Sequence, residues 1–138
     1  MSAEGKTQTR GAAIRRPRHS LWFRGGGEAH RGWYRGIWCD SSWELALVIW
    51  CLDHGVEIVR STKRFPYPFH NGVRYYQPDF VVDGQYVEVK GVMDGRSRRK
   101  LANFPMPIRV VGKREIQPML DYAKSKCGED FWKLLEKA

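Results

Sequence analysis

A strongly apolar stretch in the first half of the chain carries the clearest pattern of hydrophobic positions. It is preceded by Ser41, with Glu44 three residues later, which is the spacing of a helix capping box, and it is followed by Gly55, a plausible helix stop. We therefore expect a helix over residues 42–54. The longest uninterrupted apolar run, Leu45–Leu52, is eight residues long, far below the ~20 residues that a membrane-spanning helix needs. We expect a core helix and no membrane partner.

Alternating apolar and polar residues after this helix predict a series of strands. Residues 56–62 alternate regularly, and residues 65–69 contain prolines that suit the edge of a sheet. Two residue pairs typical of hairpin turns, Asn71-Gly72 and Asp83-Gly84, separate the strand-like segments. We expect the first turn to lead into a strand over residues 73–82, and the second to fold that strand back onto residues 85–92.

The remaining segments add helices and one more strand. Residues 94–104 are basic and compatible with a helix, residues 107–112 favour a strand, and residues 115–138 predict one or two helices broken near Cys127-Gly128. A short strand or turn over residues 32–38 leads into the fold. This order predicts an α/β or α+β domain over residues 32–138, with one core around a mixed sheet.

The Asp83-Gly84 turn fixes the pairing of the two strands that it joins. With these residues at the two central positions of a tight turn, Asp79 lies directly opposite Glu88. Because side chains alternate along a strand, Lys90 shares the face of Glu88. The other face should pack in the core through Phe80, Val82, Val87 and Val89.

Two carboxylates facing each other on a sheet repel, by an amount comparable with the ~0.2–1 kcal/mol of ordinary cross-strand pairs. Mg²⁺ is a natural compensator, because it prefers one or two carboxylates together with waters and a substrate phosphate. The carbonyl of Val89 could add a ligand, and Lys90 could hold the attacking water or the scissile phosphate. The pattern favours phosphodiester hydrolysis. The alternative is a solvated hairpin on which Lys90 merely bridges Glu88 and Asp79.

The residues around this hairpin resemble the PD-(D/E)XK nuclease superfamily. Pro78-Asp79-Phe80 is followed, eight residues after Phe80, by Glu88-Val89-Lys90-Gly91; the superfamily's hallmark is a proline-aspartate, a spacer, then an acid, any residue and lysine on a β-hairpin. From about Gly32 to Gly91, with Ser41-Ser42-Trp43-Glu44 opening the apolar helix, the order of segments resembles small phage-type and homing-type endonucleases of that superfamily.

The resemblance implies catalytic roles for four residues. Asp79 and Glu88 would be Mg²⁺ ligands, with Mn²⁺ able to substitute, and Lys90 would be the catalytic lysine. Glu44 would orient a water or a second metal, in addition to capping its helix. The resemblance also implies a restriction-endonuclease-like core, in which a mixed central β-sheet carries a β-hairpin active site and is flanked by helices.

Basic residues gather at the start of the chain. Residues 1–37 carry eight Lys and Arg against two Asp and Glu, which is six of the nine net positive charges. Residues 1–31 lack an apolar period and are rich in Gly, Arg, Ser and Pro, which predicts a flexible basic arm that contacts phosphates or serves as a solubilising tail. A second basic cluster follows the catalytic strand and could grip DNA, although a solvated helix face explains it almost as well. The predicted DNA-binding residues are Arg15, Arg16, Arg18, Arg31 and Arg35, then Arg96, Arg98, Arg99 and Lys100.

The three cysteines, Cys39, Cys51 and Cys127, lack a Cys-x-x-Cys pair, so we expect reduced thiols. Cys51 and His54 have helical spacing, and a zinc site that also uses Cys39 and His30 is a minor alternative to buried cysteines and surface histidines. No hydrophobic leader follows the initiating Met, which favours the cytoplasm of a bacterial or phage-infected cell.

These features predict a Mg²⁺-dependent endonuclease that acts on double-stranded DNA, with site-specific homing as the preferred form. A homodimer is expected, because cutting both strands needs two active sites related by symmetry. The same constellation also serves branched-DNA (Holliday-junction) resolvases and repair or recombination nucleases. The alternative from another class is a DNA-binding protein without catalysis.

Overall fold

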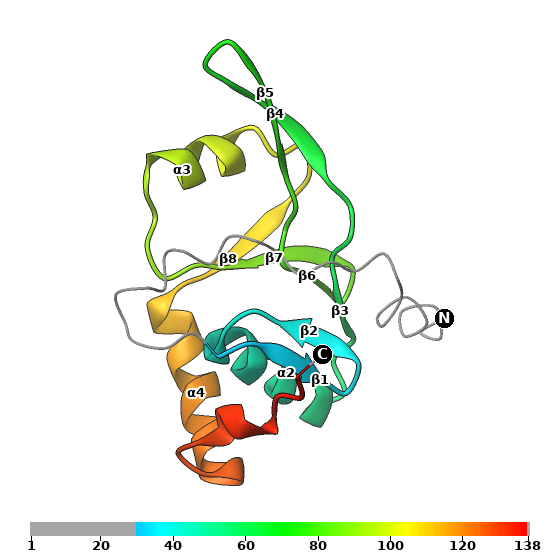
Figure 1. Cartoon of the computed structure of the whole chain (residues 1–138), viewed down its shortest axis with the longest axis vertical. Helices are drawn as coiled ribbons and strands as arrows, with labels where there is room; N and C mark the ends of the chain where they lie inside the picture. The colour runs from blue at the N-terminus through cyan, green and yellow to red at the C-terminus, as the bar shows by residue number, and fades with distance from the viewer. Residues whose placement is uncertain (1–29, 138) are drawn as a thin grey trace.

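The computed structural model describes residues 30–137 of the chain (Figure 1). The predicted arm, with Arg15, Arg16 and Arg18, lies almost entirely outside these residues. In chain order the elements are β1 (Gly32–Tyr34), β2 (Ile37–Cys39), α2 (Ser42–Asp53), β3 (Ile58–Arg60), β4 (Phe65–Phe69), β5 (Gly72–Tyr76), β6 (Phe80–Val82), β7 (Gln85–Val89), α3 (Gly95–Ala102), β8 (Ile108–Val111), α4 (Lys113–Cys127) and the 3₁₀ helix η2 (Phe131–Leu134).

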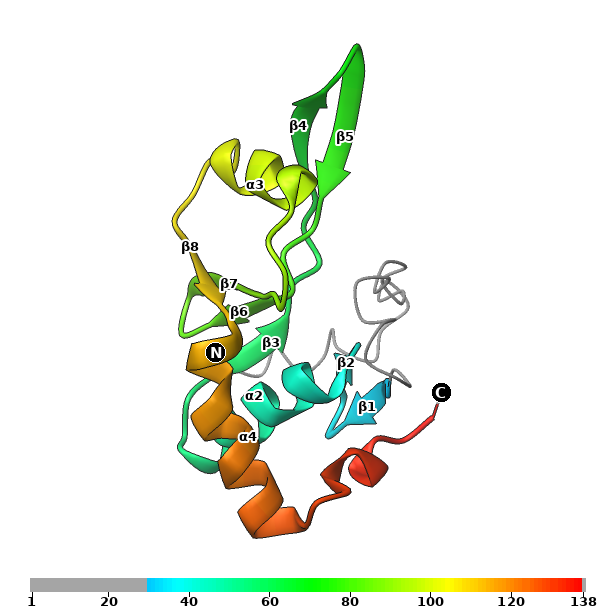
Figure 2. The same cartoon turned by 90° about the vertical axis from the view of Figure 1, so that its left-hand side faces the viewer.

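A four-stranded mixed sheet, ordered β3-β6-β7-β8, lies at the centre of the fold. β6 pairs antiparallel with β3 and β7, whereas β7 and β8 are parallel and are joined by a crossover through α3. Figures 1 and 2 show α2 and α4 on one side of this sheet and α3 on the other. The predicted combination of helices with a mixed sheet is therefore confirmed.

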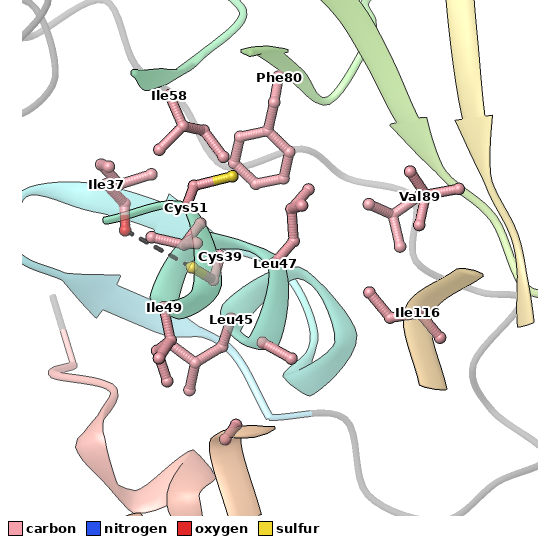
Figure 3. Close-up of a cluster of buried hydrophobic side chains, with 14 of the residues drawn as sticks. Ile37, Cys39, Leu45, Leu47, Ile49, Cys51, Ile58, Phe80, Val89 and Ile116 are labelled. Atoms are coloured by element: carbon pink, nitrogen blue, oxygen red, sulfur yellow. Dashed lines mark hydrogen bonds between the residues drawn. The ribbon is translucent and has the colours of Figure 1, made fainter. Parts of the chain in front are cut away.

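Helix α2 forms the centre of the hydrophobic core. Its N-terminus is capped as predicted, because the Ser41 hydroxyl accepts a hydrogen bond from the Glu44 amide at 3.2 Å. Leu45 and Ile49 are fully buried, and Figure 3 shows them in the same cluster as Phe80 of β6. No helix within residues 30–137 is long and apolar enough to cross a membrane.

The β6–β7 hairpin has the register that the sequence predicts. Asp83 and Gly84 both adopt positive φ angles, +49° and +82°, as expected at the two central positions of a tight Asp-Gly turn. Phe80 pairs with Val87, so continuing the register by one residue sets Asp79 opposite Glu88. The apolar face packs as expected, since Phe80, Val87 and Val89 are buried and Val82 is partly buried against the core.

The predicted continuous strand over residues 73–82 is wrong. It is divided into β5 and β6 by Gln77, Pro78 and Asp79, because Pro78 has no amide hydrogen for the ladder. The side-chain amide of Gln77 donates instead to the carbonyl of Ser61 at 2.8 Å. Asp79 consequently lies where the chain enters the central sheet.

Strands β4 and β5 form a separate two-stranded sheet, which projects from the body beside α3 in both views (Figures 1 and 2). Its turn differs from the prediction. Phe69 pairs with Gly72, so the two central residues are His70 and Asn71 rather than Asn71 and Gly72. His70 takes the positive φ angle of +54°, and Gly72 begins the returning strand.

Other helices and strands begin or end a few residues away from their predicted boundaries. The strand predicted over residues 85–92 ends at Val89, after which the chain leaves the sheet toward α3. The segment over residues 32–38 is a hairpin of two short strands, β1 and β2. The predicted break near Cys127-Gly128 is confirmed, because α4 ends at Cys127 and η2 follows.

Candidate active site at the β6–β7 hairpin

Three of the predicted residues, Asp79, Glu88 and Lys90, meet at one end of the β6–β7 hairpin. Asp79 directly precedes β6, Glu88 belongs to β7, and Lys90 directly follows β7, so each is next in sequence to a core residue of the hairpin, Phe80 or Val89. The three residues are largely enclosed, with exposed fractions of 8%, 6% and 7%. Two acids and a lysine buried this deeply need specific electrostatic compensation.

The carboxylate of Asp79 is held from two sides. Its Oδ2 accepts a hydrogen bond from the Val89 amide at 2.8 Å, and its Oδ1 lies 3.8 Å from Nη2 of Arg60. Burial raises the pKa of Asp79 well above its ordinary value, and the negative charges of Glu88 and Glu44 raise it further. The positive charge near Asp79 therefore falls short of balancing the negative charge.

Glu88 is oriented by Tyr76, whose hydroxyl donates a hydrogen bond to Oε1 at 2.6 Å. Burial raises the pKa of Glu88, while the Tyr76 hydrogen bond and the charges of Lys100 and Lys90 act in the opposite direction. Tyr76 lies within the strand expected over residues 73–82, but sequence analysis gave it no role. Its partner Glu88 lies 12 residues away, beyond the reach of strand alternation.

Lys90 shares its surroundings with a second lysine. Burial lowers the pKa of Lys90, and the positive charge of Lys100 lowers it further. Lys100 reaches over from α3, with its Nζ 5.0 Å from the centre of the Tyr76 ring. Sequence analysis predicted that Lys100 binds DNA, and in the structure its charge also acts on Glu88.

Arg60 is the main residue that sequence reasoning missed. Its Nη1 donates to Oε1 of Glu44 at 2.6 Å and to the Trp38 carbonyl at 3.2 Å, and its guanidinium lies 4.9 Å from the centre of the Phe80 ring. Burial lowers the pKa of Arg60, but the carboxylates of Glu44 and Asp79 raise it by more. Strand alternation could have indicated its position, because Arg60 lies two residues after Ile58 and therefore shares the core-facing side of the strand.

Glu44 combines a structural role with a position near the site. Its Oε1 accepts hydrogen bonds from the Asp40 amide at 2.7 Å and from Arg60. In the predicted capping box, Glu44 would accept a hydrogen bond from the amide of Ser41. It accepts one instead from the amide of the preceding residue, Asp40. Through Arg60, Glu44 is linked to Asp79, and its Oε2 takes no part in these bonds.

The donor set suits a hard divalent cation. Asp79 and Glu88 offer carboxylate oxygens. The third predicted ligand is the carbonyl oxygen of Val89, and the hydrogen bond from the Val89 amide to Asp79 holds the main chain of Val89 beside the Asp79 carboxylate. Mg²⁺ commonly uses one or two carboxylates and completes its shell with water and phosphate. Within residues 30–137, no group of three or more His, Cys, Asp or Glu side chains forms a complete metal-binding cluster. A Mg²⁺ ion here would need water and substrate as further ligands.

The minor zinc alternative gains no support. Cys39 is fully buried and directs its thiol to the Ile37 carbonyl, and burial raises the pKa of the Cys51 thiol to about 11. His54 is exposed and stacks on Trp50. The preferred interpretation of core cysteines and a surface His54 is confirmed.

The predicted DNA-binding residues that the structure describes lie in two places. Arg31 forms an ion pair with Asp40 at 3.4 Å, and Arg35 occupies the β1–β2 turn with a positive φ angle of +50°. The second group lies on α3, where Arg96, Arg98 and Arg99 are exposed and Lys100 is half-buried.

A scan against protein-family models found no match, and neither did searches of curated proteins and of solved structures.

Proposed function

We propose that this chain is a Mg²⁺-dependent DNA endonuclease of the PD-(D/E)XK type. The observation that carries the proposal is the pair of buried carboxylates, Asp79 and Glu88, at the end of one hairpin with Lys90 two residues further on. Both carboxyl groups have raised pKa values, mainly because they are buried. A divalent cation would relieve this charge imbalance, and the proposal needs that ion for catalysis.

Each residue has a task that follows from its surroundings. Bound Mg²⁺ would polarise a phosphoryl oxygen and lower the pKa of a bound water. The hydrogen bond from the Val89 amide orients the Asp79 carboxylate, and the hydrogen bond from the Tyr76 hydroxyl orients that of Glu88. Lys90 would stabilise the charge that develops on the phosphate, and Glu44 would orient a water through Oε2.

The fold also supports the proposal. The candidate site lies on a hairpin of a mixed central sheet with helices on both sides, which is the arrangement that the resemblance implies. The chain becomes exposed at Gln77, two residues before Asp79, and at Gly91, next to Lys90. Substrate would therefore approach at these ends of the strands.

The proposal is tested by incubating the full chain with a linear duplex, a cruciform-bearing plasmid and single-stranded RNA. Each substrate is tested with Mg²⁺, with Mn²⁺ and with chelator. We expect metal-dependent cleavage of DNA and none with chelator. Preference for the linear duplex would favour a homing-type enzyme, and preference for the cruciform a branched-DNA resolvase. If neither metal supports cleavage of any substrate, the enzyme hypothesis is rejected.

We further propose that the chain acts on duplex DNA as a homodimer, because two symmetric sites can cut two antiparallel strands. Sedimentation of the chain with and without duplex DNA measures the number of copies. Two copies on each duplex are expected. A single copy that nicks only one strand would contradict the dimer.

Replacing Tyr76 with phenylalanine should shift the acidic limb of the pH–rate profile upward. The Tyr76 hydroxyl lowers the pKa of Glu88, so its removal raises that pKa, and a higher pH is then needed to keep Glu88 ionised for metal binding. The readout is the cleavage rate across pH at a fixed Mg²⁺ concentration. Tyr67→Phe, another buried tyrosine of the β4–β5 hairpin, is the control and should leave the profile in place. Identical profiles for the two variants would exclude a positioning role for Tyr76.

A further inference from the structure

Three guanidinium groups converge on Phe69 at the end of β4. The Cζ atoms of Arg74, Arg99 and Arg96 lie 4.5, 5.3 and 5.7 Å from the centre of its ring. Arg74 comes from β5, while the other two lie one helical turn apart on α3. We call these three residues the Phe69 arginine cluster. The aromatic face orders the three side chains through cation–π contacts.

No acidic side chain within residues 30–137 forms an ion pair with this cluster. All three arginines are exposed. The two segments that build the surface, residues 62–78 and 95–107, contain no Asp or Glu. They contain seven basic residues: Lys63, Arg64, Arg74, Arg96, Arg98, Arg99 and Lys100. Charges of one sign gathered this closely attract a polyanion.

The cluster is continuous with the candidate active site. Lys100 follows directly after Arg99 on α3 and lies over the ring of Tyr76, which donates its hydroxyl to Glu88. The β4–β5 hairpin projects beside α3 in both views (Figures 1 and 2). A polyanion held by the hairpin and α3 would therefore extend toward Glu88.

We propose that the Phe69 arginine cluster binds successive phosphates of duplex DNA next to the site of cleavage. The planar guanidinium of arginine has five donors and can bind two phosphate oxygens at once. Stacking on Phe69 already orders the arginine side chains, so less side-chain conformational entropy is lost on binding. Phe69 is thus a positioning residue. This assignment rests on the proposed function for the identity of the polyanion, and it adds Arg74 and the hairpin, which sequence reasoning did not connect with DNA.

The test uses two triple variants of the full chain. One neutralises the cluster (Arg74→Gln, Arg96→Gln and Arg99→Gln), and the other keeps its charge with lysine at the same positions. A matched control removes three exposed charges from α4 and the segment that follows it, outside the β4–β5 hairpin and α3: Lys124→Gln, Lys133→Gln and Lys137→Gln. Fluorescence anisotropy with a labelled duplex, in chelator and over a series of salt concentrations, gives each dissociation constant. Thermal unfolding checks that all variants are folded.

Neutralising the cluster should weaken duplex binding and reduce the slope of log affinity against log salt by roughly two to three, since each phosphate contact contributes about 0.9. The lysine variant should keep the slope and lose less affinity, because a point charge retains the phosphate contact without the fork. The control should keep both. Equal slopes and affinities for the glutamine variant and the control would overturn the inference, as would arginine-dependent binding seen only with RNA or single-stranded DNA.

Failure of this inference can be told apart from failure of the proposed function. Binding is measured in chelator, where no metal-dependent cleavage occurs. A chain that shows the expected change of slope but never cuts DNA would refute only the nuclease. A chain that cuts DNA while the glutamine variant binds like the control would refute only the cluster. A chain that binds no duplex DNA would refute both.

Discussion

Replacing Lys90 with alanine is expected to lower the DNA cleavage rate by about 10²–10³-fold, the loss typical when one group that stabilises transition-state charge is removed. Lys90 is 7% exposed and lies beside the acids rather than on the basic outer surface, so affinity for uncut DNA should hardly change. Single-turnover rates at saturating enzyme separate the chemical step from binding.

The matched control for this prediction is Lys124→Ala on α4, which removes an exposed lysine far from the hairpin. It should cleave at the unaltered rate. Two results would contradict the role given to Lys90. One is unchanged cleavage by Lys90→Ala, and the other is a fall in rate matched by an equal fall in DNA affinity, which would make Lys90 a binding residue only.

Replacing Arg60 with methionine should destabilise the fold by about 3–5 kcal/mol, the range seen when one partner of a buried ion pair is removed. The side chain of Arg60 is 5% exposed, and its loss leaves Glu44, whose side chain is 2% exposed, without its ion-pair partner. The free energy of unfolding from denaturant titration measures the effect. Because Arg60 also lowers the pKa of Asp79, its removal should raise that pKa, and cleavage should fall as well.

A double-mutant cycle identifies the cause of this destabilisation. Glu44→Gln keeps an oxygen that can accept the Asp40 amide while it removes the buried charge. Adding it to Arg60→Met should restore much of the lost stability, because neutral replacement of a buried ion pair is often close to neutral. An Arg60→Met variant that loses less than about 1 kcal/mol would show that the pair contributes little, and a double variant no more stable than the single one would show that the unpaired charge of Glu44 is not the cause.

Local sequence signals were sufficient for the hairpin that carries the candidate site. The Asp83-Gly84 turn dictates a register within ten residues, so Asp79 and Glu88 could be paired before any coordinates. The same reasoning failed over residues 73–82, where the strand expected after the Asn71-Gly72 turn was continued through Pro78 although proline cannot join the ladder. The presence of Pro78 should have ended the predicted strand there.

The surroundings of the site depend on contacts between distant segments. Arg60 meets Glu44 across 16 residues, and Lys100 reaches the surroundings of Glu88 from the crossover helix α3. Neither turn chemistry nor alternation predicts which long side chain will cover a given strand end. Only the assembled sheet, with α3 on one side and α2 on the other, brings these groups together.

The sequence alone predicted the two acids and the lysine but not the degree of their enclosure. A solvated hairpin face was the main alternative, and the exposed fractions of 6–8% for Asp79, Glu88 and Lys90 disagree with it. Burial raises the pKa values of both carboxyl groups. A raised pKa in the folded state stabilises the protein at low pH, and this contribution is lost as the pH rises through the folded-state pKa, so the ion-free site weakens the fold as the pH rises above the ordinary carboxyl range.

Direct titration of Mn²⁺ into the metal-free chain, followed by electron paramagnetic resonance, tests the central claim that Asp79 and Glu88 bind a divalent cation. The unaltered chain and the control Asp121→Asn, an exposed acid of α4, should bind the ion equally well, and more tightly as the pH rises because the carboxyl groups must ionise first. Asp79→Asn and Glu88→Gln should each weaken binding at least tenfold. Equal Mn²⁺ affinity in all four proteins would contradict the account.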